Sequence, residues 1–559
     1  MNPVTDMTSR LVRASALAAF AAALLAVPAQ AFQQDEEEEG GTTRPTFQRP
    51  TIQPEVLRPQ TRQEDEEEQE DQAQPRMIDP RFAQPELRPV GPQFELSDQA
   101  LERFQAIQQD FQAGQLRLLD RQPRFEIAPN PALNFELSEL AGTRAPDDLA
   151  EQARRQNRLA DFLLRIDRDA AEAAMRTRRQ PLGEENILAQ CNPDARAFDW
   201  RDHGVVTPVR NQGGCGSCWA FSSMGAFEGS YAIRNDRTMI DTSEQRFVDC
   251  PNAGGSCGGG WWSGAFNYLM PTGTSEEARY PYTASNDQCQ ARTPTPYHAV
   301  AWGYVDSAGS TPSVSDMKDA LCRYGPLTVA VNATSAFQSY SSGVFNENAS
   351  GGINHGVTLV GWDDADGAWI IKNSWGTGWG MNGYMRIAYG SNRIGQGAAW
   401  VQARNESYLR EDCVGFDPRT TEVAREQGRW KIVDGSHWLF DFDGNRREAR
   451  QAMQVIEHYG LNRSCFIGRP DPSMSYLLAG EEAPQGPMRG EDCIGFDPAD
   501  LDVREVDGSW KLIEGSMWLM DFGNNSEEAW LTLAAIQRYG FTHQCFVGRP
   551  DPSFTYWRK

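Results

Sequence analysis

The chain is most informative at Gln212-Gly-Gly-Cys215-Gly-Ser-Cys218-Trp219-Ala-Phe221-Ser. The residues that follow, 219–233, are rich in Ala, Phe and Met and predict a buried helix. A cysteine at a helix N-terminus lies at the positive end of the helix dipole, which favours the thiolate over the thiol. Since the thiolate is the nucleophilic form, this stretch presents Cys218 as a candidate catalytic nucleophile.

Two further motifs lie downstream of this cysteine. They are Asn354-His355-Gly356 and Lys372-Asn373-Ser374-Trp375-Gly376. A Cys-Gly-Ser-Cys-Trp stretch with His and Asn roughly 130–150 residues further on is the local signature of papain-like cysteine peptidases. From about residue 199 to residue 402 the chain resembles that family, and three motifs in the same order and spacing make the resemblance specific.

The resemblance implies a Cys-His-Asn triad and the residues that serve it. His355 would pair with the Cys218 thiolate as an imidazolium ion and later protonate the leaving amine. Asn373 would hold the imidazole through its side-chain carbonyl, and Trp375 would shield that contact from water. The Gln212 side-chain amide and the Cys218 backbone N–H would face the developing oxyanion.

The same resemblance implies where a substrate would bind. Gly259 and Gly260 would form a wall of bare backbone that pairs with an extended peptide. Trp262 and Ala330 fall where the family forms its second subsite, which suggests a hydrophobic preference, although core packing would equally explain Trp262. Trp379 matches a tryptophan beyond the scissile bond. Endopeptidase activity is the default expectation, and acyl transfer to an amine would use the same triad.

The implied fold is α+β, with a papain-like catalytic domain over residues 191–405 that has a helical lobe and a β-barrel-like lobe. The resemblance suggests two disulfides, and Cys191 with Cys322 is a candidate extra pair. Two more pairs are expected after this domain, because small cores benefit from such staples. The expected pairs are Cys215 with Cys257, Cys250 with Cys289, Cys191 with Cys322, Cys413 with Cys465, and Cys493 with Cys545. Of the 11 cysteines only Cys218 then keeps a free thiol.

The region before this domain, residues 94–190, is expected to be a helical propeptide. Residues 100–107 resemble a degenerate form of the family's propeptide helix, and residues 130–140 resemble the segment that follows it. An unrelated helical spacer is the alternative. We expect autocatalytic removal of this region between about residues 176 and 192.

The first residues predict export. Two arginines precede a short apolar run over 14–27 and an Ala-Gln-Ala cleavage site, so residues 1–31 are interpreted as a signal peptide. Residues 32–93 are acidic and rich in Pro and Gln, which predicts disorder. The expected location is secreted or periplasmic, where disulfides persist.

The C-terminal part is a tandem duplication. Glu411-Asp-Cys-Val-Gly-Phe-Asp-Pro recurs as Glu491-Asp-Cys-Ile-Gly-Phe-Asp-Pro, and the offset stays at 80 residues (411 to 491, 465 to 545). We define the first repeat as residues 406–480 and the second repeat as residues 486–559. Each is expected to be a small α+β module with a hairpin, a helix over 446–459 or its equivalent, and a strand with the second cysteine.

The role of the repeats stays open between two possibilities. They could bind a cell-surface or cell-wall ligand or a protein substrate, with Trp438, Trp518 and Trp557 as candidate stacking platforms. A purely structural or export role is the alternative. An adhesion protein whose peptidase domain is inactive is a further alternative for the whole chain, which the four filled catalytic positions disfavour.

Charge and residue usage exclude other classes. The formal net charge of −24 argues against a general nucleic-acid binder, which needs a basic face to neutralise phosphates. The cysteines are accounted for as disulfides and the six histidines are scattered, so no metal site or cofactor is expected. The expected partners are protein or peptide substrates, and we expect a monomer.

Overall fold

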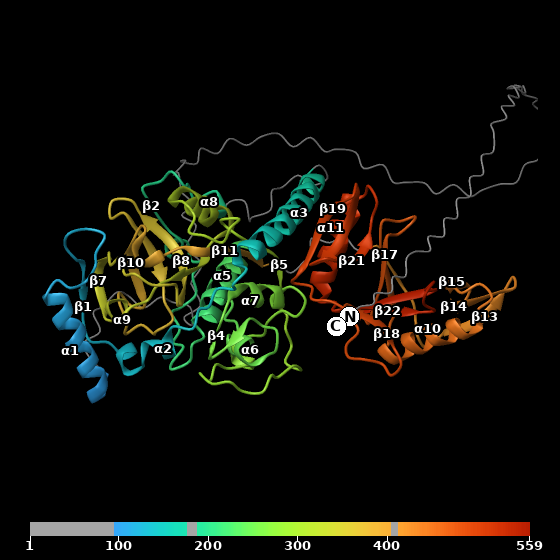
Figure 1. Ribbon diagram of the computed structural model, residues 1–559, viewed down its shortest axis with the longest axis horizontal. Helices are drawn as coiled ribbons and strands as arrows, with labels where there is room; N and C mark the ends of the chain where they lie inside the picture. Colours follow the sequence, from blue (N-terminus) through green and yellow to red (C-terminus); the bar gives the residue numbers. More distant parts are fainter. Residues whose placement is uncertain (1–93, 176–186, 404–411) are drawn as a thin grey trace, which may run out of the picture. The chain divides into compact units, whose positions relative to one another are not determined.

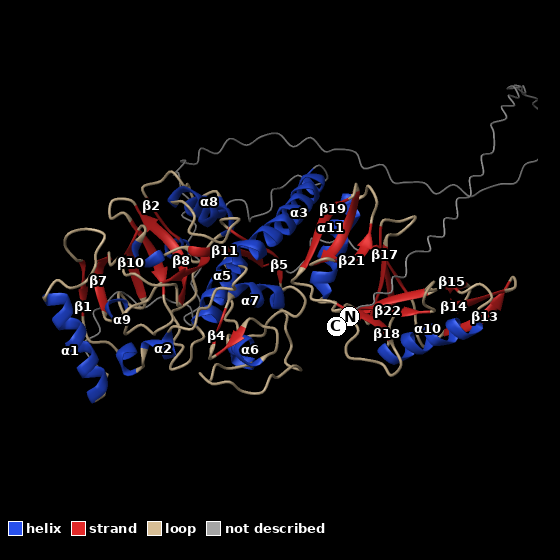
Figure 2. Ribbon diagram, viewed as in Figure 1, coloured by secondary structure: helices blue, strands red, loops and turns tan. Residues whose placement is uncertain are grey.

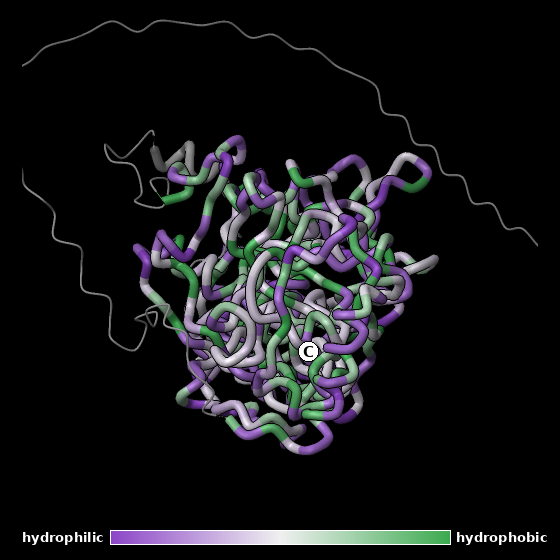
Figure 3. Tube along the Cα trace, turned by 90° about the vertical axis from the view of Figure 1, so that its left-hand side faces the viewer, coloured by the Kyte–Doolittle hydropathy of each residue, from purple (hydrophilic) through white to green (hydrophobic). Residues whose placement is uncertain are grey.

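A computed structural model describes residues 94–175, 187–403 and 412–559. The expected signal peptide and acidic segment lie outside the described residues. Figure 3 shows hydrophilic residues gathered in the outer loops, with hydrophobic stretches further inside. None of the helices in the described ranges has the length and apolar character needed to cross a membrane.

The expected catalytic region is built around a nine-stranded sheet. Its strands pair antiparallel, apart from the parallel pair of β7 and β10. In sheet order they are β1 (Arg124–Ile127), β7 (Tyr340–Phe345), β10 (Tyr384–Ala388), β9 (Ala368–Lys372), β8 (His355–Asp363), β6 (Leu327–Val331), β11 (Gln396–Ala403) and β5 (Ala299–Tyr304), while β2 (Ala197–Asp199) pairs with β8 outside this path. Strands β8 and β9 are rich in apolar residues and buried along nearly their whole length, so β8 holds its first residue, His355, rigidly.

Helix α5 (Cys218–Arg234) packs against this sheet (Figure 1). Two glycines allow the close approach. A Cβ atom at Gly225 would lie 2.4 Å from Thr358 Oγ1, and one at Gly229 would lie 2.6 Å from Pro326 Cγ. Since any larger residue would push the helix outward, Gly225 helps to set the distance between the helix and β8, and Gly229 the distance between the helix and the start of β6.

Shorter elements complete the two lobes of the catalytic region. Figure 2 shows α5, α6 and α7 gathered in a helical part and β7, β8 and β10 in a strand-rich part, as expected for an α+β fold with two lobes. The remaining elements are η3 (Trp200–His203), α6 (Gln245–Asp249), β3 (Gly255–Ser256), β4 (Gly259–Gly260), α7 (Trp262–Leu269), η4 (Glu277–Arg279), α8 (Val314–Tyr324), α9 (Ser335–Gln338) and η5 (Ser391–Arg393).

The N-terminal region touches both ends of the large sheet. Strand β1 pairs with β7 at one end, and helix α3 (Leu149–Met175) contacts β5 at the other. The Ser97 side chain caps α1 by accepting a hydrogen bond from the backbone N–H of Ala100. The elements before α3 are α1 (Asp98–Gln112), β1, η2 (Pro131–Asn134) and α2 (Leu137–Leu140).

Disulfides join segments that are far apart in the chain. The structure pairs Cys191 with Cys322, Cys215 with Cys257, Cys250 with Cys289, Cys413 with Cys465, and Cys493 with Cys545. Cys218 is the free cysteine.

Each C-terminal repeat contains two three-stranded sheets and one helix. In the first repeat these are the sheet of β12 (Asp412–Gly415), β16 (Arg463–Ile467) and β17 (Met474–Leu478), the sheet of β13 (Thr421–Glu426), β14 (Arg429–Asp434) and β15 (His437–Asp441), and helix α10 (Arg446–Tyr459). In the second they are the sheet of β18 (Asp492–Gly495), β22 (His543–Val547) and β23 (Phe554–Arg558), the sheet of β19 (Leu501–Val506), β20 (Ser509–Glu514) and β21 (Met517–Asp521), and helix α11 (Ser526–Tyr539).

The two repeats share their cores. Helix α10 packs on β13 and β14 of its own repeat and also on β22 of the other, and α11 packs on β19 and β20 and also on β16. Phe554 of the second repeat is buried against Phe440 of the first, with ring centroids 5.0 Å apart. Reciprocally, Tyr476 of the first repeat packs on Tyr539 of the second. Neither repeat therefore has a core made only of its own residues.

The shared core gives a test of the architecture. Phe554→Ala should cost about 3–5 kcal/mol, because a large buried aromatic ring is removed. The loss should appear in the first repeat as faster amide hydrogen exchange along α10, although the substitution lies in the second. Trp438→Ala is the control, because that side chain is 61% exposed and its removal should leave exchange unchanged. Faster exchange confined to α11 would contradict the shared core.

Candidate active site

The free thiol lies at the start of a buried helix. Cys218 is the first residue of α5 and is fully buried. Burial raises the pKa of a thiol, but the charge of His355 and hydrogen bonds from His355, Thr143 and the Gly356 backbone outweigh it. The pKa of Cys218 is therefore lowered from 9.0 to about 7. A large thiolate fraction is thus available near neutral pH.

The imidazole beside this thiol is held by one amide. His355 Nε2 lies 2.8 Å from Asn373 Oδ1, and the backbone N–H of Ser374 donates to the same oxygen at 2.8 Å. Because a carbonyl oxygen only accepts, Nε2 carries a proton and Nδ1 is the nitrogen left for the thiol. Among the described residues His355 Nδ1 has no other hydrogen-bond partner.

Aromatic rings cover the contact between His355 and Asn373. The ring centroids of Trp375 and His355 are 4.6 Å apart, and those of Trp375 and Trp379 are 5.3 Å apart. All four side chains are almost completely buried. Excluding water in this way strengthens the hydrogen bond that orients the imidazole.

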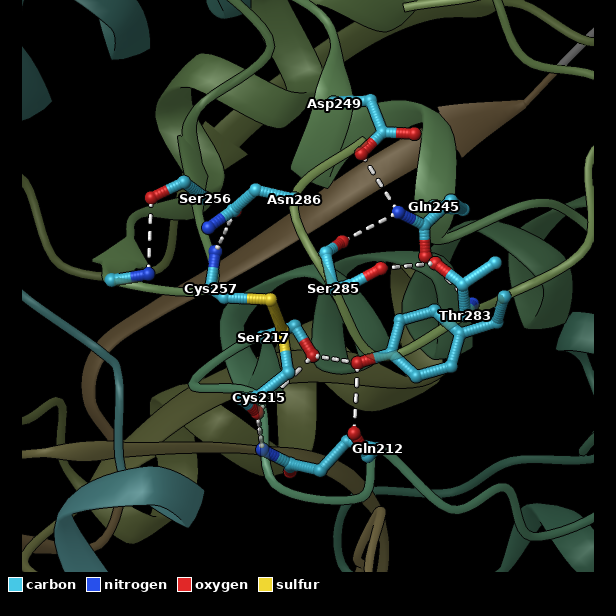
Figure 4. The surroundings of a disulfide bond; sticks show 12 residues. Gln212, Cys215, Ser217, Gln245, Asp249, Ser256, Cys257, Thr283, Ser285 and Asn286 are labelled. Atoms are coloured by element: carbon cyan, nitrogen blue, oxygen red, sulfur yellow. Dashed lines mark hydrogen bonds between the residues drawn. A yellow bond between two sulfur atoms is a disulfide. The ribbon is translucent and has the colours of Figure 1, made fainter. Parts of the chain in front are cut away.

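The Gln212 amide is fixed from both ends. Its Oε1 accepts from Ser374 Oγ at 2.7 Å, and its Nε2 donates to the carbonyls of Cys215 at 2.6 Å and Leu140 at 2.9 Å. Figure 4 shows the contact with Cys215, whose disulfide to Cys257 ties this loop to the neighbouring one. The Gln212 amide is thus a preorganised donor, and here it binds a carbonyl from the N-terminal region.

Residues 140–144, called here the cleft segment, lie across the thiol. The Gly142 N–H and Thr143 Oγ1 are 3.3 and 3.2 Å from Cys218 Sγ. The Gly260 N–H donates to the Gly142 carbonyl at 2.9 Å, and the Arg144 N–H donates to the Gly260 carbonyl at 3.0 Å. Thr143 and Gly260 form a parallel bridge.

Only glycine fits where the cleft segment passes the thiol. A Cβ atom at Gly142 would lie 1.8 Å from the Gly216 carbonyl oxygen, which is a severe clash with backbone. The wall opposite is equally tight, because a Cβ at Gly259 would lie 2.4 Å from the Gly142 oxygen. The two segments can therefore pass this close to each other only because both have glycine at the contact.

The other residues expected at substrate subsites occupy different environments. Gly259 and Gly260 form strand β4 and contact the cleft segment. Trp262 and Ala330 are fully buried, and Trp262 belongs to the hydrophobic core. Trp375 and Trp379 are buried beside His355, and Trp379 Nε1 donates to the Gln338 carbonyl at 3.1 Å.

Some functional contacts were not anticipated from the sequence. Leu140 contacts Gln212, Gly142 and Thr143 contact Cys218, and Ser374 fixes the Gln212 side chain. Ser374 lies in the Lys372–Gly376 motif, directly after Asn373. Its place in that motif could have marked it as a residue of the site. For the cleft segment the signal was weak, because Ala-Gly-Thr has no pattern of its own.

One group of potential metal ligands occurs among the described residues. Glu491, Cys493 and Cys545 place ligand atoms close together. The two cysteines form a disulfide with each other, so neither offers a thiolate. This group does not have the chemistry of a metal centre.

Comparisons with known proteins point to one family. Residues 195–403 match the family model described as papain family cysteine protease. The chain is 38% identical over 252 residues to cathepsin L of Sarcophaga peregrina, covering 42% of this chain and 73% of that protein. It is 41% identical over 197 residues to a cathepsin L-like proteinase of Fasciola hepatica, covering 34% of this chain and 59% of that protein. The chain thus spans less than two thirds of the Fasciola protein.

Solved structures of the same group align with parts of the chain. Digestive procathepsin L2 proteinase from Tenebrio molitor is 28% identical and covers 54% of this chain and 89% of its own, with a TM-score of 0.41. A Carica candamarcensis cysteine protease in complex with E-64 is 34% identical and covers 37% of this chain and 98% of its own, with a TM-score of 0.34.

The lowered thiol pKa can be tested by titration. In the unchanged protein the thiolate absorbance of Cys218 should rise with pH through a midpoint near 7. In His355→Ala burial remains but the stabilising charge and hydrogen bond of His355 are lost, so the midpoint should move to higher pH. Subtracting the titration of Cys218→Ala removes the tyrosine signal. An unchanged midpoint in His355→Ala would mean that His355 does not stabilise the thiolate.

The fit of Gly142 can be tested by alkylation. Gly142→Ala should displace the cleft segment at a cost of ~1–3 kcal/mol, so iodoacetamide should label Cys218 about tenfold faster or more. Labelling reports on this site alone, because Cys218 is the free cysteine. Gly352→Ala is the matched control, because a Cβ there meets nothing within 4 Å. Equal labelling rates in the two variants would refute the tight fit.

Proposed function

Since this chain belongs to the papain family of cysteine proteases, we propose that it is an endopeptidase that hydrolyses peptide bonds in proteins through Cys218, His355 and Asn373. The observation that carries the proposal is the buried free thiol with its lowered pKa beside an imidazole oriented by Asn373. The preorganised Gln212 amide supplies the remaining requirement of acyl chemistry, a donor for an oxyanion.

The proposed reaction has two stages. The Cys218 thiolate attacks the substrate carbonyl, and the Gln212 Nε2–H and the Cys218 backbone N–H stabilise the resulting oxyanion. The protonated His355 gives its proton to the leaving amine, which leaves a thioester on Cys218. Neutral His355 then takes a proton from water, the hydroxide attacks the thioester, and the acid product leaves as the thiolate is restored. An amine in place of that water would give acyl transfer.

The proposed precursor is a zymogen in which residues 94–190 are the propeptide. The cleft segment lies against the nucleophile, and its Leu140 carbonyl accepts a hydrogen bond from the Gln212 side-chain amide. Thr143 of the cleft segment forms a parallel bridge with Gly260. This chain direction supports the proposal that the cleft segment presents no scissile bond to Cys218. Removal would follow a cut between about residues 176 and 192, most of which lies outside the described residues.

The proposed specificity remains a hydrophobic residue at the second subsite, formed by Trp262 and Ala330. Protein substrates are proposed because the matched relatives include a digestive cysteine proteinase of Homarus americanus. Export to the periplasm or the medium is proposed from the N-terminal sequence and is consistent with five disulfides.

A binding or targeting role is proposed for the repeats. Trp438 and Trp518 are 61% and 58% exposed, at equivalent positions, and a lysine lies over each ring. Such exposed aromatic faces are suited to stacking on a ligand. Trp557 is buried, so it does not offer a third platform.

Hydrolysis of casein by purified protein, from which an added protease has removed the proposed propeptide in every variant, tests the proposed activity. Cys218→Ala should lower the rate about 10³-fold or more, because the nucleophile is lost. Gln212→Ala should lower it about 10²–10³-fold through loss of an oxyanion donor, with casein binding nearly unchanged. The exposed Gln290→Ala is the matched control and should retain full activity. Undiminished hydrolysis by Cys218→Ala would reject the mechanism.

A further inference from the structure

The helices of the two repeats differ on one face. In α10 the positions Arg450, Gln451 and Gln454 are polar and exposed. In α11 the equivalent positions hold Trp530, Leu531 and Ala534, all partly or fully buried. Since each helix already buries its other side between two sheets, α11 has acquired a second apolar face that its copy lacks.

Helix α3 of the N-terminal region covers this second face. The rings of Phe162 and Trp530 are stacked with centroids 6.0 Å apart. Phe162 is 4% exposed, so its ring is almost fully removed from water. The hydrophobic core of the catalytic region continues through α3 into the second repeat, whereas α10 lies in a separate core.

Charged groups extend the contact beyond the aromatic pair. Arg155 Nη2 lies 2.9 Å from Asp500 Oδ1, and Arg158 Nη2 lies 2.6 Å from Asp502 Oδ2. The Asp502 side chain is 2% exposed and the Arg158 side chain is 41% exposed, so the carboxylate is the buried member of this pair. The first repeat has Thr420 in place of Asp500, so this acidic partner is present only in the second repeat.

The opposite side of α3 is fixed to the catalytic sheet. The Asn157 side chain accepts from the Tyr304 N–H at 2.8 Å and donates to the Tyr304 carbonyl at 3.0 Å. The Gln156 side chain donates to the Trp302 carbonyl at 2.7 Å. These amides satisfy backbone groups of β5, the last strand in the sheet order, so α3 lies between β5 and the second repeat.

We propose that the face of the second repeat formed by Trp530, Leu531, Ala534, Asp500 and Asp502 is a docking site for helix α3 and retains the propeptide on the enzyme. A cut after α3 would leave the cleft segment linked to a helix that is still held on two sides. The chain break alone would therefore not open the active site, and release would require α3 to leave this face.

The consequence for activation depends on the proposed zymogen function, but the docking itself does not. The test therefore uses a full-length chain with Cys218→Ala, which cannot cut itself, and a recognition site for an added protease inserted within residues 176–186. After cleavage we expect the N-terminal fragment to co-elute with the rest of the chain in size-exclusion chromatography. Dilution then gives the dissociation constant of the fragment.

Substitutions in this background test which face holds the fragment. Trp530→Arg should raise the dissociation constant about tenfold or more, because it removes a buried aromatic anchor. The variant should fold, because arginine occupies the equivalent position, Arg450, in the first repeat. The matched control is Trp518→Arg in the same repeat, where the side chain is 58% exposed and no change is expected.

A charge exchange separates docking from general destabilisation. Arg155→Asp and Asp500→Arg should each raise the dissociation constant severalfold, and the double variant should recover most of the loss. Equal dissociation constants of the fragment in Trp530→Arg and Trp518→Arg would overturn the proposal. A double variant whose dissociation constant stays as high as in the single variants would also overturn it. Failure of the protein with Cys218 intact to hydrolyse casein, once the cleaved N-terminal fragment has been removed, would reject the proposed function while leaving this result intact.

Discussion

The hydrogen bond between His355 Nε2 and Asn373 Oδ1 is the interaction on which the rest of the active site depends. It fixes which imidazole nitrogen faces the thiol, and through that nitrogen it controls the charge beside Cys218. The surrounding structure maintains this one contact. Strand β8 supplies the histidine, the chain after β9 supplies the asparagine, and the Ser374 N–H fixes the amide.

The residues proposed for catalysis could be singled out from the sequence because their signals are local. Cys218, His355 and Asn373 each lie in a short motif, and the helix that positions Cys218 has a strong apolar pattern. The helix of the second repeat was likewise expected at the equivalent of 446–459, and it spans Ser526–Tyr539 with the Asn525 side chain as its cap. Such features depend on neighbours in sequence, which a single chain displays directly.

Features that depend on the path of the chain in space were not predictable. The approach of Gly142 to Cys218 brings together residues 76 positions apart, and neither shows a sequence pattern for it. The sharing of cores was hidden for a different reason. An apolar residue such as Phe554 has the same pattern whether it packs in its own repeat or in the other. Trp557 shows the same ambiguity, because a tryptophan at a strand end is equally compatible with exposure and burial.

The packing of each repeat's helix on a sheet of the other repeat also bears on how the pair arose. A protein with a single copy would leave the inner side of its helix uncovered, and a second molecule could cover it by the same contacts in both directions. That arrangement is an isologous dimer related by a two-fold axis, and it would form only above a certain concentration. Joining the copies in one chain makes the association intramolecular, so it no longer depends on dilution. Once the copies were joined, each could change separately. Helix α11 of the second repeat was then free to acquire the apolar face that α3 now covers.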